Sequence, residues 1–520
     1  MPSPFGDPDG SRGPLESQTD RFISLPSRFG PVGRPVSEYS RAHVIAGTQG
    51  VGKTLFLRRL QDHFAADNSV NSTRPNLKSR NLGTEQVIDF SQLFRKTANT
   101  EAWSVLWANA IRLSAATHVL TDSSALIGAD GVATASLRRL LLRWLPKATT
   151  PRSPVETASL LCSLIGSRHE FELMQQDDTW IELERLLQKA LRESRELYLF
   201  VDAIDDNYRW APAYWQQCQR GLFYAVMDTE RTDVEASKLH TVIAIRDLVL
   251  SSVARSEHAA RYLRSPSIVQ LDWTWASCAA FLNAKLYQLE WQYFPASAEE
   301  KTFASLFGRS SIRNDARGMD EPLQQYFLRH TRLNPRDIII MGNDLLDFAE
   351  HKGVLPAELS DSDLRERIAK ISRHLARGSL AQVGNQVMTN VMPWNASQQR
   401  YLESYINSDE HTSDAIIREL QSILRSAGCE RFDAEGLERL ESEARSRFGA
   451  GCRFADVLWQ NRLLGCIDAK GQATFYDGTM LDEITIEEAE EYLLNPIVLD
   501  LVPSLRVVEG EVMFPSGAQA

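Results

Sequence analysis

The sequence predicts an α/β fold in which a parallel sheet is followed by a helical lid and a mostly α-helical C-terminal region. Three observations predict it. A glycine-rich loop at residues 47–54 lies between an apolar, strand-like stretch at 42–46 and apolar residues at helical spacing. Two more strand-like runs, the apolar residues 197–201 and residues 240–245, lead to charged residues. Beyond residue 275 the apolar residues recur mainly at helical spacing, which indicates that helices replace strands there.

The glycine-rich loop carries the most specific signal in the chain. Its residues are Gly47, Thr48, Gln49, Gly50, Val51, Gly52, Lys53 and Thr54. The glycines allow the backbone N–H groups to converge on phosphate oxygens, and the helix that follows directs its positive dipole end to the same place. Lys53 would reach the β- and γ-phosphates, and the hydroxyl of Thr54 would bind Mg²⁺. The loop therefore predicts a P-loop NTPase core.

The second apolar run indicates hydrolysis as well as binding. Residues 197–201 are apolar and lead directly to Asp202, which we expect to hold Mg²⁺ through water. Asp205 and Asp206 follow within one short turn. A carboxylate at this place can polarise the attacking water as a general base, a role that we assign to Asp206, with Asp205 as the alternative. An amphipathic helix with Thr179 as its N-cap precedes the run, as expected for a parallel sheet with helical crossovers.

The third run ends in a cation. Residues 240–245 lead to Arg246, which at the tip of a strand beside the acid-bearing one would sense the γ-phosphate. The alternative is a surface arginine paired with Asp247. A fourth strand is predicted at 267–271, and it leads into a helix over residues 279–286.

Together these patterns resemble the STAND ATPases of the AAA+ superfamily. The segment from Asp202 to Asp206 is similar to the NACHT form, and Arg246 stands where the family carries its sensor arginine. Residues 331–339 (TRLNPRDII) resemble the lid motif of STAND and origin-recognition ATPases, in which a proline and in some members an arginine face the nucleotide. On this sequence the matching residues are Pro335 and Arg336. The resemblance covers roughly residues 40–350 by element order.

The resemblance implies ATP and Mg²⁺ as cofactors and a switch in which nucleotide binding closes the core on the lid. We find no guanine-reading Asn/Thr-Lys-x-Asp tetrapeptide, which favours ATP over GTP. Lys53, Arg246 and Arg336 would hold the γ-phosphate. An arginine from a neighbouring subunit could complete the site, for which Arg261 and Arg264 are the candidates. Partners would be further copies of the chain or a separate effector or sensor protein, because the chain is too short for the long sensor repeats of many STAND proteins.

Composition and pattern changes suggest the domain boundaries. Residues 1–38 are rich in Pro, Gly and Ser and predict a flexible arm, with a segment that orders against a partner as the alternative. The ATPase core is expected at 39–275, and the 149 positions from Lys53 to Asp202 (202 − 53) require an insertion. The expected parts are thus a helical insertion at 91–178 after a strand at 86–90, a lid at 276–355, a C-terminal domain at 356–505 and a tail at 506–520.

The whole-chain composition narrows the function classes. The net charge of −11 across 520 residues argues against a surface that coats nucleic acid, although it permits a local basic patch. Six cysteines without a C-x-x-C pair predict reduced thiols in a cytoplasmic protein. No stretch predicts a membrane span, and no histidine spacing predicts a metal beyond the Mg²⁺ of the nucleotide.

The C-terminal region carries a hairpin signal. Residues 455–464 predict a helix, and strand-like residues on either side of an Ala-Lys-Gly turn at 469–471 follow it. Helices before a hairpin are the order of a winged helix, so an ATP-gated DNA-binding protein is one alternative function. Acidic residues at 483–491 favour interdomain packing over DNA contact. A scaffold that binds ATP with little turnover is the other alternative.

Overall fold

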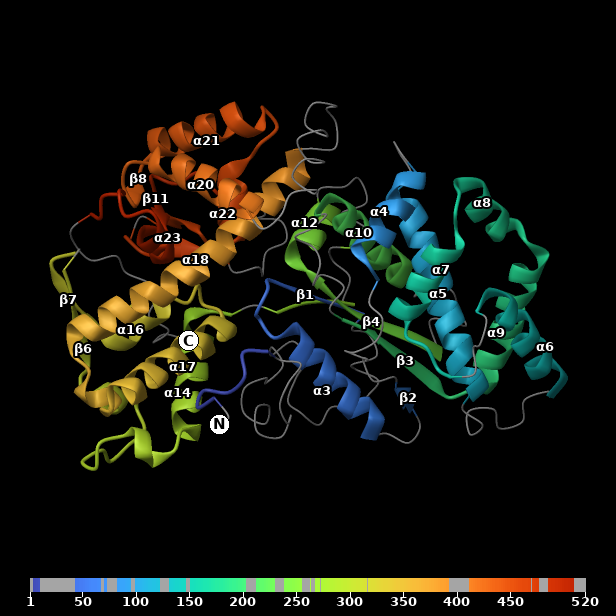
Figure 1. Ribbon diagram of the computed structural model, residues 1–520, viewed down its shortest axis with the longest axis horizontal. Coiled ribbons are helices and arrows are strands. Elements are labelled where there is room, and N and C mark those ends of the chain that lie inside the picture. The colour runs from blue at the N-terminus through green and yellow to red at the C-terminus, as the bar shows by residue number, and fades with distance from the viewer. Residues whose placement is uncertain are drawn as a thin grey trace. The chain divides into compact units, whose positions relative to one another are not determined.

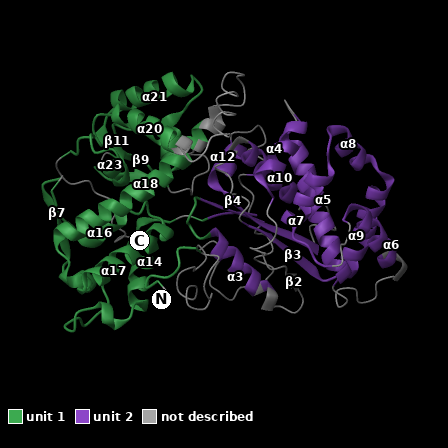
Figure 2. Cartoon of the chain, viewed as in Figure 1, with its two compact units in different colours: residues 1–24, 48–52, 271–520 green, residues 25–47, 53–270 purple. Residues whose placement is uncertain are grey.

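The computed structural model places helices and strands as drawn in Figure 1. It describes residues 3–9, 43–66, 70–72, 82–94, 99–121, 131–145, 150–202, 212–229, 238–254, 262, 267–271, 273–315, 317–391, 411–468, 470–476 and 485–508. The chain divides into two compact units (Figure 2). Unit 1 comprises Met1–Ser24, Thr48–Gly52 and Leu271–Ala520, and unit 2 comprises Leu25–Gly47 and Lys53–Gln270.

Unit 2 contains the parallel sheet that the sequence predicts. Its strands are β1 (Val44–Gly47), β2 (Val70–Ser72), β3 (Glu196–Val201), β4 (Leu239–Arg246) and β5 (Ile268–Gln270). Their order is β2-β3-β4-β1-β5, and every neighbouring pair is parallel. Strands buried on both faces are almost entirely apolar, which is why β1, β3, β4 and β5 stand out in the sequence as apolar runs. The α/β fold class is confirmed.

Helices surround this sheet in unit 2. Helix α3 (Lys53–Ala66) follows β1, and α12 (Asp247–Ala254) follows β4. Between β2 and β3 lie α4 (Thr84–Leu93), α5 (Asn99–Thr121), α6 (Gly131–Trp144), α7 (Pro154–Leu164), α8 (Arg168–Gln176) and α9 (Asp178–Glu193). Helices α5 to α8 fall within the helical insertion expected at 91–178. After β3 comes α10 (Pro212–Thr229), which lies against α5 so closely that a Cβ on Gly221 would sit 2.3 Å from that of Trp103. The tryptophans of α5, Trp103 and Trp107, are fully buried.

Two local expectations in this unit are wrong. Residues 86–90 belong to helix α4 instead of a strand, because Val87 and Phe90 are buried three positions apart and the Gln86 side chain accepts a hydrogen bond from the Gly83 N–H at 3.0 Å. The N-cap of α9 is Asp177, not Thr179. Its carboxylate accepts hydrogen bonds from both the N–H and the hydroxyl of Thr179, at 2.8 and 2.6 Å.

The helical part of unit 1 follows β5 in the chain. It contains α14 (Trp275–Gln288), α15 (Phe303–Phe307), α16 (Leu323–Arg329), α17 (Pro335–Lys352) and α18 (Asp361–Val391). Two short 3-10 helices and an antiparallel hairpin, β6 (Ser311–Asn314) with β7 (Met319–Pro322), connect them. Their apolar faces share one core that includes Leu282, Phe327, Met341 and Ile368.

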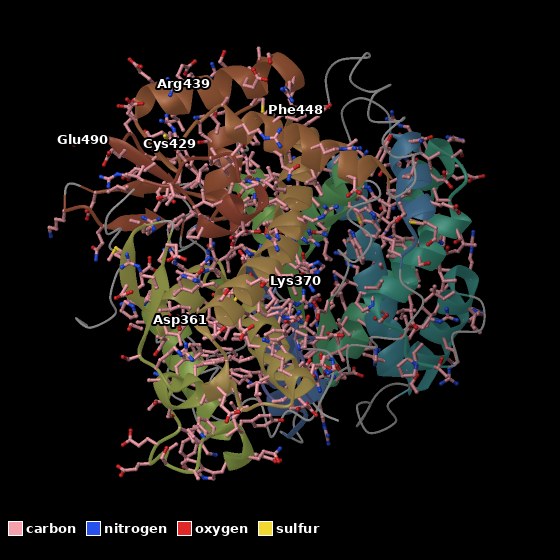
Figure 3. The ribbon with its side chains drawn as sticks, turned by 60° about the vertical axis from the view of Figure 1, so that its left-hand side comes forward. Asp361, Lys370, Cys429, Arg439, Phe448 and Glu490 are labelled. Atoms are coloured by element: carbon pink, nitrogen blue, oxygen red, sulfur yellow. The ribbon has the colours of Figure 1, made fainter. Side chains whose placement is uncertain are left out.

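The C-terminal part of unit 1 adds a second sheet. Its helices are α20 (His411–Arg425), α21 (Ala434–Phe448), α22 (Phe454–Gln460) and α23 (Pro496–Leu501). The strands β8 (Arg431–Phe432), β9 (Leu464–Ile467), β10 (Ala473–Phe475) and β11 (Glu491–Leu494) form an antiparallel sheet in the order β10-β9-β11-β8. The predicted hairpin is confirmed as β9–β10, with Ala473 opposite Ile467. Helix α21 carries Arg439 on its exposed side and ends at the buried Phe448 (Figure 3).

The first residues of the chain differ from the expected flexible arm. Residues 3–9 belong to unit 1, and Phe5, only 2% exposed, is part of the helical core. The aromatic side chain of Phe5 supplies the apolar surface that an ordered segment needs, whereas the Pro, Gly and Ser content of residues 1–38 had suggested none. The other residues of 1–38 lie outside the described part of the chain.

Further expectations concern thiols, metals and membranes. Cys218, Cys278 and Cys452 are buried, the other three cysteines are half-buried, and all six are free thiols. Within the described ranges, we find no group of three or more His, Cys, Asp or Glu side chains arranged to hold a metal ion. None of the helices in those ranges combines the length and apolar character that crossing a bilayer requires.

Candidate functional site

The glycine-rich loop connects strand β1 to helix α3, which is the setting that phosphate binding needs. All four residues of β1 are buried, so the strand fixes the start of the loop in the interior of unit 2. Gly50 and Gly52 have φ angles of +93° and +101°. L-residues with side chains rarely adopt such angles, so the path of this loop requires glycine at both positions. At Gly52 an added Cβ would meet nothing within 4 Å, so backbone conformation rather than packing requires this glycine.

Lys53 begins helix α3 and lies back along the loop. Its Nζ donates a hydrogen bond of 2.9 Å to the carbonyl oxygen of Gly47, the first residue of the motif. Thr54 is the next residue of the same helix turn and is half-buried. No acidic residue occupies the first turn of α3, so the positive end of the helix dipole is not offset there. The ammonium group, the hydroxyl and the helix N-terminus suit the charge of a polyphosphate and its Mg²⁺.

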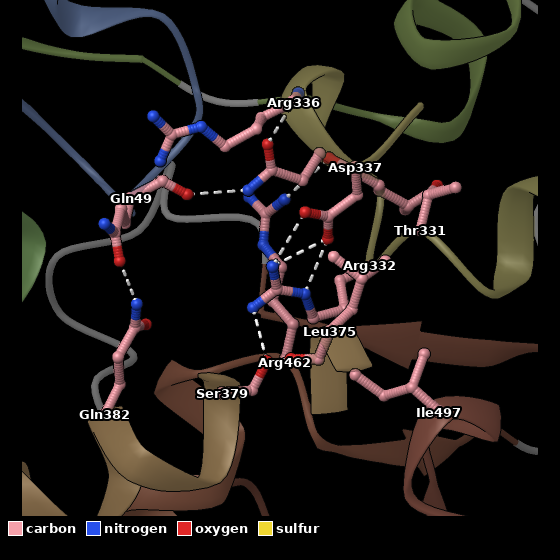
Figure 4. Close-up of polar contacts among 12 residues, drawn as sticks. Gln49, Thr331, Arg332, Arg336, Asp337, Leu375, Ser379, Gln382, Arg462 and Ile497 are labelled. Carbon is pink, nitrogen blue, oxygen red and sulfur yellow. Dashed lines mark hydrogen bonds and ion pairs between the residues drawn. The ribbon is translucent and has the colours of Figure 1, made fainter. Parts of the chain in front are cut away.

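Two side chains of unit 1 hold carbonyl groups of the loop. The Nδ2 of Asn334 donates to Gln49 O at 2.7 Å, and the indole N–H of Trp273 donates to Val51 O at 3.0 Å. The side-chain amide of Gln382 on α18 also donates to that of Gln49 (Figure 4). Residues 48–52 are therefore fixed by side chains that lie more than 200 positions later in the sequence.

Asn334 contacts the loop and helix α17 at the same time. Its Oδ1 accepts a hydrogen bond of 3.0 Å from the N–H of Arg336, which caps helix α17, and Pro335 occupies the first helical position. A Cβ added to Gly50 would lie 2.7 Å from Asn334 Oδ1 and 3.0 Å from the Cβ of Arg336. The predicted lid residues Pro335 and Arg336 thus start a helix whose N-cap contacts the glycine loop directly.

The turn before Asn334 has a strained backbone. Arg332 and Leu333 have φ angles of 49° and 51°, which are uncommon for residues with side chains and together cost about 2–6 kcal/mol. The Arg332 guanidinium binds both carboxylate oxygens of Asp337 at 2.8 and 3.0 Å and donates to Ser379 Oγ at 2.6 Å (Figure 4). Strain of this kind persists only where surrounding contacts impose it, and it is concentrated at functional sites.

A third residue with positive φ supports the same turn from the C-terminal part of unit 1. Arg462, with φ of 58°, donates from Nη1 to Leu333 O at 3.2 Å. Asn495, the N-cap of α23, in turn donates from Nδ2 to Arg462 O at 3.0 Å. Hydrogen bonds therefore connect the second sheet of unit 1, through the strained turn and Asn334, to the glycine loop.

The ion pair at this turn is almost fully enclosed. The side chain of Asp337 is 1% exposed and that of Arg332 is 16% exposed. Burial raises the pKa of Asp337 above its ordinary value, while the charge of Arg332 and its hydrogen bonds act in the opposite direction. Loss of the Arg332 side chain would leave this buried carboxylate without its hydrogen-bonded ion-pair partner, so we infer that the pair fixes the backbone that carries Asn334.

In unit 2 the other predicted residues follow neighbouring strands. Strand β4 lies between β1 and β3, and Arg246 at its end is in register with Gly47. Asp202 follows β3 directly and is half-buried. The chain leaves β1 toward β2 and leaves β4 toward β5, in opposite directions along the sheet. In parallel α/β sheets, ligands bind at the carboxyl ends of strands where the connections diverge in this way.

The structure thus brings some of the predicted residues together, and others lie outside the part of the chain that it describes. Lys53 contacts Gly47 in unit 2, and Gly50 lies against Arg336 in unit 1. Asp205, Asp206, Arg261 and Arg264 lie outside the described residues. Sequence reasoning missed Asn334, Trp273 and Gln382 as contacts of the loop. For Asn334 a signal was present, since asparagine followed by proline is a typical start of a helix.

Comparison with known proteins does not assign a family to this chain. No family model matches the sequence, and no curated protein matches it.

Two substitutions of Asn334 distinguish the effects of its two hydrogen bonds. Asn334→Ala removes both, and we expect it to lower the free energy of unfolding by about 1 kcal/mol through loss of the α17 cap. Asn334→Asp keeps the acceptor for the Arg336 N–H but loses the donor to Gln49 O. Urea unfolding should therefore show the larger loss for alanine, whereas hydrogen exchange of residues 48–52 should accelerate in both variants. Unchanged exchange in both would show that Asn334 does not hold the loop.

Proposed function

We propose that this chain binds ATP with Mg²⁺ at residues 47–54 and hydrolyses it, acting as a nucleotide-dependent switch of the STAND and AAA+ type. The observation that carries the proposal is the loop itself: φ of +93° at Gly50 and +101° at Gly52, between a buried strand and a helix that begins with Lys53 and Thr54. Few ligands other than a polyphosphate use this combination of backbone N–H groups, a helix N-terminus and an ammonium group.

Each residue has a defined role in this proposal. Lys53 neutralises the β- and γ-phosphates, and Thr54 and Asp202 hold the Mg²⁺ that ATP brings. Asp206, with Asp205 as the alternative, orients and polarises the attacking water. Arg246, at the end of the strand beside β1, responds to the γ-phosphate. Phosphoryl transfer depends mainly on positioning and charge neutralisation, which these groups supply.

The contacts of the loop within unit 1 support a switch. Gln49 O and Val51 O accept hydrogen bonds from Asn334 and Trp273, so a shift of the loop on phosphate binding displaces the start of α17. A ligand shifts a conformational equilibrium only through contacts that differ between the two states. In this proposal these hydrogen bonds differ between the nucleotide-bound and nucleotide-free states, and the output is assembly with further copies of the chain or with a separate effector.

The C-terminal sheet favours a second candidate function, ATP-gated DNA binding. Helices α20, α21 and α22 precede the β9–β10 hairpin, the order of a winged helix, and Lys470 lies in the hairpin turn. An ATP-gated DNA-binding protein would use this element. Fold alone does not establish DNA binding, and the net charge of −11 opposes it.

The test measures ATP turnover together with mass in solution, with and without ATP, for the wild type and for Asp206→Asn. We expect slow turnover by the wild type and an ATP-bound oligomer that accumulates in the variant. Nucleotide binding without turnover in either protein would favour the scaffold alternative. Salt-sensitive DNA binding that requires ATP would favour the loader alternative, and the absence of nucleotide binding would contradict all three.

A further inference from the structure

A short segment at the start of the chain is seated on helix α17. The ring of Phe5 is 2% exposed and packs into the helical core of unit 1. It lies over Gly342, where an added Cβ would come within 2.8 Å of the ring. Gly342 has ordinary helical backbone angles, so the backbone conformation does not require glycine at this position. The absence of a side chain instead makes room for the aromatic ring.

The next residue of α17 binds the backbone of the segment. The Oδ1 of Asn343 accepts a hydrogen bond of 2.7 Å from the N–H of Phe5, and its Nδ2 donates to Gly6 O at 3.0 Å. One side-chain amide thus uses both its donor and its acceptor on the same peptide segment. Such paired recognition of a backbone, with one aromatic anchor, is typical of a peptide-binding site.

The segment has the residues to hold its own shape. Ser3, Pro4, Phe5 and Gly6 form a turn closed by a hydrogen bond of 2.8 Å from Gly6 N to Ser3 O. Serine at the first position, proline at the second and glycine at the fourth are the preferred residues of a type I turn. Asp7 closes a second turn, because its Oδ1 accepts from the Asp9 N–H at 2.8 Å. A preformed turn loses little conformational entropy on docking.

The docked segment also holds Arg336. The Nε of Arg336 donates to Pro8 O at 3.1 Å. The N–H of the same residue donates to Asn334, which contacts Gln49 of the glycine loop. A hydrogen bond at Nε orients the planar guanidinium and leaves its charge and its two terminal amino groups for an anion.

We propose that α17 carries a docking site for the Ser-Pro-Phe-Gly-Asp-Pro segment of this chain, and that docking positions Arg336 toward a nucleotide phosphate. The second part rests on the proposed ATP function, whereas the first part is independent of it. Because coupling between binding equilibria is reciprocal, release of the segment weakens nucleotide binding, and bound nucleotide shifts the segment toward its docked state. A molecule that captures residues 3–9 would thereby lower the affinity of the chain for ATP.

Gly342→Ala tests the docking site in the full-length chain. Alanine is favourable in a helix, but its Cβ would occupy the space under the Phe5 ring. We expect hydrogen exchange at Phe5 and Gly6 to accelerate by about tenfold or more, while α17 remains protected. Gly378→Ala is the matched control, because an added Cβ on that exposed glycine of α18 meets nothing within 4 Å. Equal exchange in the two variants would overturn the docking site.

A labelled peptide of residues 3–9 provides the second arm. It should bind to full-length Phe5→Ala, whose own segment has lost its anchor, and should not bind to the Phe5→Ala/Gly342→Ala double variant. The result is read by fluorescence anisotropy without nucleotide, so it stands even if the chain does not bind ATP. Equal binding to both variants would contradict recognition at Gly342.

A double-mutant cycle on ATP affinity tests the coupling. Phe5→Ala should weaken ATP binding by about fivefold, and the effect should disappear in an Arg336→Ala background if the segment acts through that arginine. A released segment with unchanged ATP affinity would overturn the positioning of Arg336 and leave the docking site intact. Failure of every variant, and of the wild type, to bind ATP would count against the proposed function alone.

Discussion

Lys53→Ala should abolish detectable ATP binding and turnover. The Lys53 Nζ, now 2.9 Å from Gly47 O, is the cation of the loop and would exchange this carbonyl for phosphate oxygens. A charge-assisted contact to a phosphate is among the strong hydrogen bonds, so its loss should cost about 3 kcal/mol or more of binding free energy, about a hundredfold in affinity. Calorimetric titration with ATP and Mg²⁺ measures the effect.

The fold of the variant must be intact for this result to count. Loss of the hydrogen bond from Lys53 to Gly47 O should lower the free energy of unfolding by about 1 kcal/mol. Lys370→Ala is the matched control, because this lysine is exposed on α18 (Figure 3). ATP at about a hundred times the wild-type dissociation constant should stabilise the wild type and the control by about 2.7 kcal/mol, and Lys53→Ala by no more than about 0.4 kcal/mol. Unchanged turnover in Lys53→Ala would refute the ATPase proposal.

Most of the parallel sheet could be predicted because its buried strands are largely apolar. Strands β1, β3, β4 and β5 each correspond to a predicted run. Strand β2 reads Val-Asn-Ser and pairs in parallel with the start of β3, so its backbone partner defines it and no apolar pattern does. The segment 86–90 illustrates the opposite failure, since a short apolar stretch fits a strand and a helix equally well until its buried neighbours are known.

The site could be predicted only where its residues are close in sequence. Eight consecutive residues define the glycine loop, and its glycines adopt the backbone that the motif requires. The contacts that hold the loop could not be predicted, because Asn334 and Gln49 are separated by 285 positions. The separation is 338 positions between Phe5 and Asn343. Pairings over such distances arise from packing of the folded chain and leave no periodic trace in the sequence.

Arg317→Met should destabilise unit 1 more than any surface substitution. Arg317 Nη2 lies 2.9 Å from Glu430 Oε1, and the two side chains are 3% and 0% exposed. Burial raises the pKa of Glu430, and the charge of Arg317 opposes this shift. Removal of the cation leaves a buried carboxylate without its closest partner, which costs about 3–5 kcal/mol at neutral pH. Urea unfolding of the full-length chain measures the loss.

A second substitution shows whether the loss of stability comes from the unpaired buried charge or from the lost packing of the Arg317 side chain. In the Arg317→Met/Glu430→Gln variant no unpaired carboxylate remains, so most of the lost stability should return. Arg439→Met is the control: its pair with Glu435, at 4.0 Å and largely exposed, should be worth less than about 0.5 kcal/mol. An Arg317→Met loss that persists in the double variant would instead assign the effect to packing of the Arg317 side chain.

The pH dependence of the free energy of unfolding of Arg317→Met tests independently whether the buried carboxylate of Glu430 causes the loss of stability. A carboxyl group whose pKa is raised in the folded state binds more protons there than in the unfolded chain, so stability falls as pH rises between the two pKa values. Without Arg317 the folded pKa of Glu430 rises further. The deficit of Arg317→Met relative to the wild type should therefore be largest at neutral pH and shrink as the pH is lowered toward the raised pKa. Because Arg317 precedes β7 and Glu430 precedes β8, a deficit of this kind would show that a buried charge joins the helical part of unit 1 to its C-terminal sheet.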